Sequence, residues 1–327
     1  MVNTSSGGFG EYYAIAAAIS WAICMFPFTE AARRLTPNTV NHFRLLMAFI
    51  ILSVILTFFS PLTWQELFLV PNWENWLWLG LSGVIGLSLA DYFGFNMLAI
   101  LGVKLGSLFG TLSPGAALLF SYLLLGEKIS WIGFAGIMIT IFGIAWLSLS
   151  KREKASIPDL GFGDINKGIL YGFLSAICVG IGLVLSKKGL HHPTSEDGEL
   201  NPIHANWIRM MLATVSIFAL TTGAGKLKMA SEKFFQNKDN GSIYLFIATI
   251  FGPVTAVSFS LFAIKMIKVS VAQTIFSLVP VFVLPISYFI YKEKINARTL
   301  IASTIAIGGV MIVIWRSEID SLIKSIY

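Results

Sequence analysis

The chain has 327 residues, of which 56% are hydrophobic and only 12% are charged, and its mean hydropathy is +0.77. So apolar a composition excludes an ordinary water-soluble protein and indicates that a lipid bilayer surrounds much of the chain. The net charge of +6 is not gathered into a basic domain, so nucleic acid is not an expected partner, and the cations are typical of segments that flank membrane helices.

Ten apolar runs follow one another along the chain, each near the 20 or so residues that a helix needs to span a bilayer. The runs are continuous, whereas the strands of an outer-membrane barrel alternate apolar and polar residues. The sequence therefore predicts an all-α membrane protein with ten transmembrane helices. The runs are Tyr12–Ala31, Val40–Phe59, Trp76–Ile100, Leu105–Leu125, Trp131–Leu149, Gly168–Ser186, Ile203–Thr222, Ile243–Ile264, Val271–Tyr291 and Thr299–Trp315.

The second half of the chain repeats the first. Residues 114–147 recur at 280–313 with a constant displacement of 166 positions, and a displacement of 165 aligns Asn41 and Arg44 with Asn206 and Arg209. Five helices per copy is an odd number, so the copies are expected to cross the membrane in opposite directions, as inverted repeats of secondary transporters do. We expect a five-helix repeat at 1–150, a linker loop at 151–166, a second repeat at 167–316 and a short tail at 317–327.

Several of these residues resemble a known family, the ten-helix drug/metabolite transporter superfamily of EamA type. The resemblance is carried by Asn41-x-x-Arg44-x-x-x-Ala48, by Leu89-Ala90-Asp91 in a glycine-rich helix, and by Pro114 followed by Leu125-Gly126-Glu127. The second copy departs from this pattern, since Lys292 precedes Glu293 and Ser258 lies near the place of the acid. The resemblance implies transport of a small solute through a central cavity by alternating access, and it names no solute.

Four ionisable charges lie within the apolar runs, namely Glu30, Arg44, Asp91 and Arg209. Charges at this depth usually face a bundle interior or a watery cavity and have a partner. At 1.5 Å per residue, Arg44 and Asp91 fall near one level of the membrane. Two interpretations stay open: the pair lines a cavity in which Asp91 binds a substrate amine or takes a coupling proton, or it is an ion pair that only fixes helix register. Arg209 either steers an anionic group or contacts helix ends.

Other residues are candidates for the same cavity. Asn41 and Asn206 share a helical stripe with the two arginines, and Trp21, Asn96 and Ser258 are aromatic or uncharged polar groups in neighbouring runs. Pro114 and Pro280 occupy corresponding places and each removes a backbone hydrogen bond, so they indicate either a gate or a static kink.

Enzymatic motifs are poor. The four histidines, His42, His191, His192 and His204, show no metal-ligand spacing, and neither a nucleophile elbow nor a phosphate-binding loop is present, so we expect no metal and no cofactor. A polytopic membrane enzyme, with Glu30, His42 and Asp91 as its only conceivable acid–base set, and a membrane scaffold without flux remain the alternatives.

The sequence is best explained as a secondary transporter of a small organic solute, multi-pass in the cell (inner) membrane. Export of amino-acid-like metabolites is the first substrate hypothesis; hydrophobic cations or drugs and sugar derivatives are the others. The orientation stays open, because Lys and Arg in the loops place both termini outside, whereas the resemblance implies termini in the cytoplasm. The sequence gives no indication of the oligomeric state.

Overall fold

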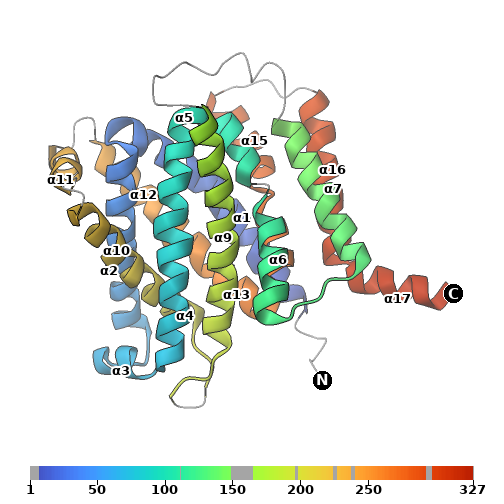
Figure 1. The fold of residues 1–327 in the computed structure, drawn as a ribbon, viewed down its shortest axis with the longest axis horizontal. Coiled ribbons are helices and arrows are strands. Elements are labelled where there is room, and N and C mark those ends of the chain that lie inside the picture. The colour runs from blue at the N-terminus through green and yellow to red at the C-terminus, as the bar shows by residue number, and fades with distance from the viewer. Residues whose placement is uncertain are drawn as a thin grey trace.

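The regular structure of the protein is helical (Figure 1). The computed structural model describes residues 7–110, 112–148, 165–195, 198–223, 227–236, 240–291 and 297–326. In chain order the helices are α1 (Gly7–Arg34), α2 (Pro37–Phe59), α3 (Trp64–Leu69), α4 (Trp73–Gly83), the π-helical η2 (Val84–Leu89), α5 (Ala90–Gly110), α6 (Ser113–Leu125), α7 (Trp131–Ser148), α9 (Ile165–His191), α10 (Pro202–Gly223), α11 (Leu227–Gln236), α12 (Gly241–Thr249), the π-helical η4 (Ile250–Ala256), α13 (Val257–Met266), α14 (Val269–Phe276), α15 (Val279–Tyr291), α16 (Ala297–Ile314) and α17 (Arg316–Ile326).

The helices have the length and surface of membrane-spanning elements. Within the described residues, five are long and apolar enough to cross a bilayer, or six if the bent pair of α16 and α17 is one span, and shorter apolar helices accompany them. Large apolar side chains such as Phe59, Leu123 and Phe289 are mostly exposed on the outside of the bundle. Because water would penalise so many exposed apolar groups, lipid is the fitting environment. The protein is an integral, multi-pass membrane protein.

The fourth and ninth apolar runs differ from the helices that form. The third run extends as α5 to Gly110, so the fourth helix, α6, begins only at Ser113, and the ninth run divides into α14 and α15. A proline at position i cannot donate to the carbonyl four residues earlier. Pro114 thus lacks the hydrogen bond to the carbonyl of Gly110, where α5 ends. Likewise, Pro280 lacks the hydrogen bond to the carbonyl of Phe276, where α14 ends. The expected kinks inside continuous helices are therefore wrong, since both prolines lie in the first turn of a new helix, where proline is tolerated.

Helix boundaries recur along the chain. The bounds of α6 and α15 are 166 positions apart at both ends, as are those of α7 and α16, and the η2 and η4 segments also begin 166 positions apart. The most extensive contacts join helices from different halves, namely α7 with α16, α5 with α9, α1 with α13 and α2 with α10. Figure 1 shows α7 and α16 side by side at one end of the molecule. The two halves are therefore interleaved.

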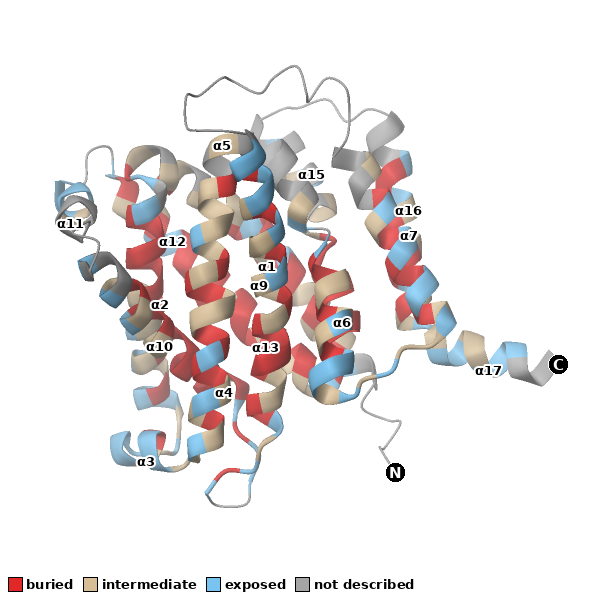
Figure 2. Cartoon of the chain, in the orientation of Figure 1, coloured by how far each residue is buried: buried red, intermediate tan, exposed pale blue. Residues whose placement is uncertain are grey.

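The buried residues concentrate in the middle of the bundle, whereas α3 and α17 are largely exposed at its periphery (Figure 2). The sequence treated residues 317–327 as a tail, yet α17 forms there and is bent 68° from α16. Ile319, Leu322 and Ile323 recur at helical spacing between polar residues, which is the pattern of a helix lying at a membrane surface. The expected linker at 151–166 falls almost wholly outside the described residues.

Candidate functional site

Two π-helical segments lie at equivalent positions of the two halves and form the centre of the candidate site. Wide π turns are rare and are found mostly at functional sites. A methyl group built on Gly86 of η2 would lie 2.8 Å from the Cα of Gly182 in α9, and one on Gly252 of η4 would lie 3.1 Å from the sulfur of Cys24 in α1. Each π segment thus packs against the first helix of the opposite half, with glycine permitting the close approach.

In the first half, the structure brings Arg44 and Asp91 together as an ion pair between α2 and α5. The Arg44 Nε donates to Asn41 Oδ1 at 3.3 Å, and its Nη2 lies 3.5 Å from the carbonyl of Leu87 in η2. The guanidinium also lies over the ring of Phe95, 5.8 Å from its centroid. Arg44 is buried, whereas 30% of the Asp91 side chain is exposed. The pair therefore joins a fully enclosed cation to an acidic side chain that is only partly buried, although the oxygen facing Arg44 is enclosed.

In the second half, Asn206 takes the place of Arg44 at the π segment. Its Nδ2 donates to the carbonyl of Pro253 in η4 and to Ser258 Oγ, each at 3.0 Å. Pro253 is 166 positions from Leu87, so the same backbone carbonyl accepts a hydrogen bond in both halves. Arg209 is as buried as Arg44, but within the described part of the chain its Nε and Nη1 have no hydrogen-bond partner. Asn206 Oδ1 also lacks one there.

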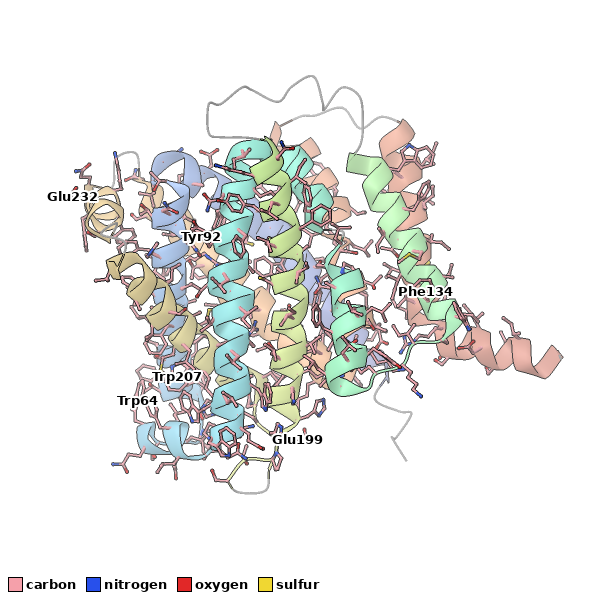
Figure 3. All side chains as sticks on the ribbon, in the orientation of Figure 1. Trp64, Tyr92, Phe134, Glu199, Trp207 and Glu232 are labelled. Carbon is pink, nitrogen blue, oxygen red and sulfur yellow. The ribbon has the colours of Figure 1, made fainter. Side chains whose placement is uncertain are left out.

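The remaining predicted residues are not gathered around the ion pair by any described contact. Trp21 is half-buried and packs against the main apolar core from α1. Asn96 Nδ2 donates to the carbonyl of Tyr92 at 2.6 Å, one turn back on α5. Figure 3 labels Tyr92 on this helix. Pro114 is buried at the start of α6, and the side chain of Pro280 lies outside the described residues.

At one end of the bundle, charged groups on loops and helix ends link segments of the two halves. Glu127, just after α6, forms an ion pair with Lys187 of α9 at 2.7 Å, and its Oε2 accepts the N–H of Val269 at 3.0 Å. Lys187 also donates to the carbonyl of Ile267 at 2.7 Å, where the chain breaks between α13 and α14. Both charged side chains are largely buried. We call Glu127, Lys187, Ile267 and Val269 the end network; it joins the first half to the second.

The groups of the alternative acid–base set make separate contacts. Glu30 pairs with Arg34 at 3.4 Å, and His42 Nδ1 lies 2.6 Å from the carbonyl of Asn38 in its own helix. His204 Nε2 lies 2.8 Å from the carbonyl of Leu67, which anchors α3. Across the described ranges, three or more His, Cys, Asp or Glu residues nowhere gather in a group able to hold a metal ion.

Sequence reasoning missed the backbone carbonyls of Leu87 and Pro253, because only a structure shows that the helices widen there. The alignment of Gly86 with Gly252 was the available signal. It also missed Gln273, which is buried in α14 and donates to Ser113 of α6 at 2.7 Å, and Lys187, whose partner Glu127 was noticed only as part of a motif. These contacts join positions more than 40 residues apart, which a single sequence does not reveal.

The fold is that of a multi-pass membrane protein with a buried ion pair, and comparison with known proteins supports a membrane transporter. A sequence model of the EamA-like transporter family matches residues 8–149 and again 166–315. The chain therefore belongs to the EamA-like transporter family, within the drug/metabolite transporter superfamily.

Individual relatives are distant. An uncharacterized transporter of Synechocystis sp. is 23% identical over 265 residues, covering 78% of this chain and 76% of its own. An uncharacterized transporter of Clostridium kluyveri is 27% identical over 149 residues, covering 46% of this chain and 45% of its own. A protein of known crystal structure superposes with a TM-score of 0.65 at 14% identity, over 93% of this chain and 95% of that one. The last likeness concerns the fold alone.

Proposed function

We propose that the protein is a secondary transporter that moves a small organic solute by alternating access between two inverted five-helix repeats, residues 1–150 and 167–316. The observation that carries the proposal is the pairing of equivalent elements: both halves have a π segment at the same place, and each π segment packs against the opposite half. Transporters of this design bind their solute where the repeats meet, at interrupted helices near the membrane midplane.

The inversion is supported by the contact between α7 and α16, which are equivalent helices. A methyl group on Gly136 would meet Val313, and one on Gly143 would meet Ala306, so α16 runs backward as α7 runs forward. The contact is also reciprocal, because Gly309, the equivalent of Gly143, meets Thr140, the equivalent of Ala306. Equivalent helices that pack antiparallel and reciprocally are related by a local two-fold axis, as inverted repeats require.

Alternating access requires one end of the pathway to be closed while the other opens, and the end network supplies such a closure. It ties the loop after α6 to α9 and to the start of α14, elements of different halves. The equivalent segments also differ in shape. The second half breaks at Ile267 between α13 and α14, whereas α5 is continuous over the equivalent stretch of the first half. Such asymmetry between matched halves supports two interchangeable conformations.

Asp91 is the proposed site of proton or amine binding. Its side chain is partly exposed although it pairs with a buried arginine, so protonation or an incoming ammonium group would compete with Arg44 for the carboxylate. The solute is proposed to be amino-acid-like, because Asp91 and the arginines offer groups for both ends of an amphoteric molecule. The proposed direction is export from the cell.

The test is counterflow in liposomes that contain the purified protein. Vesicles are preloaded with one unlabelled solute and diluted into the same solute carrying a label; amino acids, sugars and a hydrophobic cation are compared one at a time. Transient accumulation of an amino acid above the level of protein-free vesicles supports the proposal. Chemical conversion of the solute would support an enzyme, and neither accumulation nor conversion with any class would contradict transport.

A further inference from the structure

The two matched arginines of the halves are not in the same state. Arg44 is held by Asp91, by Asn41 and by the carbonyl of Leu87. In the second half the hydrogen bond equivalent to that between Arg44 and Asn41 is open: the donor, Arg209 Nε, and the acceptor, Asn206 Oδ1, both lack partners within the described residues. The second half therefore has an arginine with unused hydrogen-bond donors at the position where the arginine of the first half has an ion pair and a hydrogen bond.

A buried guanidinium without a counter-charge is costly, because desolvation of the ion is not repaid by a neighbour. The position equivalent to Asp91 is Val257, which has no charge to offer. Arg209 is 3% exposed and retains its positive charge in any ordinary environment. An anion placed against Arg209 would accept from its unused donors and would also supply the counter-charge that Val257 does not.

The surroundings of Arg209 suit a small ligand between the halves. Its Nη2 lies 3.7 Å from the place where a methyl group on Gly86 would stand, so the absent side chain of η2 leaves the guanidinium facing the opposite half. The Asn206 side chain is held in place by its two hydrogen bonds to Pro253 and Ser258. Its unused Oδ1 is therefore held in a fixed position. A planar arginine fork matches the paired oxygens of a carboxylate or a phosphate.

The contact between α10 and the end of α4, next to η2, is closed as the structure stands, since a methyl group on Gly83 would lie 2.4 Å from the carbonyl of Arg209. In the proposed transport cycle, movement of one half against the other would open it. Resting on the proposed transport function, we infer that Arg209 receives an anionic group with paired oxygens, a carboxylate or a phosphate, on the transported solute. Arg44, already neutralised by Asp91, does not perform this role.

The test uses the purified full-length protein and two simple probes, acetate and inorganic phosphate, each titrated against chloride at constant ionic strength. Ligands that bind only the folded protein raise its unfolding temperature in a saturable way. We expect saturation with one probe, which tells carboxylate from phosphate, and loss of that response in Arg209→Gln. The matched control is Arg34→Gln at the end of α1, where the arginine is half-buried and pairs with Glu30; this variant should respond as the wild type does.

Arg209→Gln should also unfold at a higher temperature than the wild type when no oxyanion is present, because it removes an unpaired buried charge. A merely structural arginine would give the reverse. If Arg209→Gln does not fold, Arg209→Lys is the variant to test. It keeps the positive charge but lacks the planar guanidinium, so it should bind the probe about tenfold more weakly. Absence of a saturable response in the wild type, its survival in Arg209→Gln, or an unweakened response in Arg209→Lys overturns the inference. Counterflow that persists in that case leaves the transport proposal standing.

Discussion

Two adjacent glycines of α16 are expected to respond to alanine in opposite directions. A methyl group on Gly309 would lie 2.6 Å from the backbone N of Thr140 and 2.8 Å from the carbonyl oxygen of Gly136, whereas one on Gly308 would meet nothing within 4 Å. Non-bonded heavy atoms prefer separations of about 3.5 Å or more, so α7 and α16 would have to part by roughly 1 Å to admit Gly309→Ala. Backbone atoms cannot rotate away as a side-chain tip does.

The magnitudes follow from these distances. Alanine gains about 1 kcal/mol over glycine within a helix, which Gly308→Ala should realise as added stability. Overpacking a tight contact costs about 1 to 3 kcal/mol, so Gly309→Ala should lose stability despite the same helical gain. The measurement is unfolding of each purified variant in mild detergent, followed by circular dichroism. The reasoning fails if the two variants shift in the same direction or if Gly309→Ala is the more stable.

Three further predictions concern the charged groups. Asp91→Asn should abolish the pH dependence of transport in liposomes while the protein remains folded, and unchanged pH dependence would remove Asp91 from the mechanism. Arg44→Ala should lower the free energy of unfolding by roughly 2 kcal/mol, below the 3 to 5 kcal/mol of a fully buried pair because Asp91 is partly exposed. Arg34→Ala, which breaks a half-buried pair between residues four apart on α1, should cost less than about 1 kcal/mol; equal losses would refute the assignment. Glu127→Gln should loosen the end network. A cysteine that replaces the buried Ser270 should then react faster with a thiol reagent than the same cysteine does in a protein that keeps Glu127. Equal reaction rates would count against a closure there.

Much of the fold follows from the sequence, since each of the ten apolar runs contains helix and the all-helical membrane class is confirmed. The errors lie where composition gives no boundary. The stretch from Leu105 to Gly110 is as apolar as the helix after it, so hydropathy assigned it to the wrong helix, whereas the lost hydrogen bond at Pro114 places the break correctly. The helix at 316–326 was missed because its apolar residues are too sparse for a membrane span.

The candidate site was predictable in its charges and unpredictable in its geometry. Intramembrane cost singled out Arg44, Asp91 and Arg209, and depth alone placed the first two near one level, where the structure pairs them. No local pattern distinguishes a satisfied arginine from an unsatisfied one, because Arg44 and Arg209 occupy the same motif. The difference depends on η2 and η4, whose widened turns arise from packing between distant segments.

The orientation of the two halves is the most direct test of the account. Thr36 and Asn201 are exposed, equivalent residues that precede α2 and α10. Each is replaced by cysteine in a background in which Cys24 and Cys178 are alanine, and a membrane-impermeant thiol reagent is applied to one side of sealed vesicles. Inverted repeats predict that the two cysteines are labelled from opposite sides of the membrane; labelling of both from the same side would contradict the account.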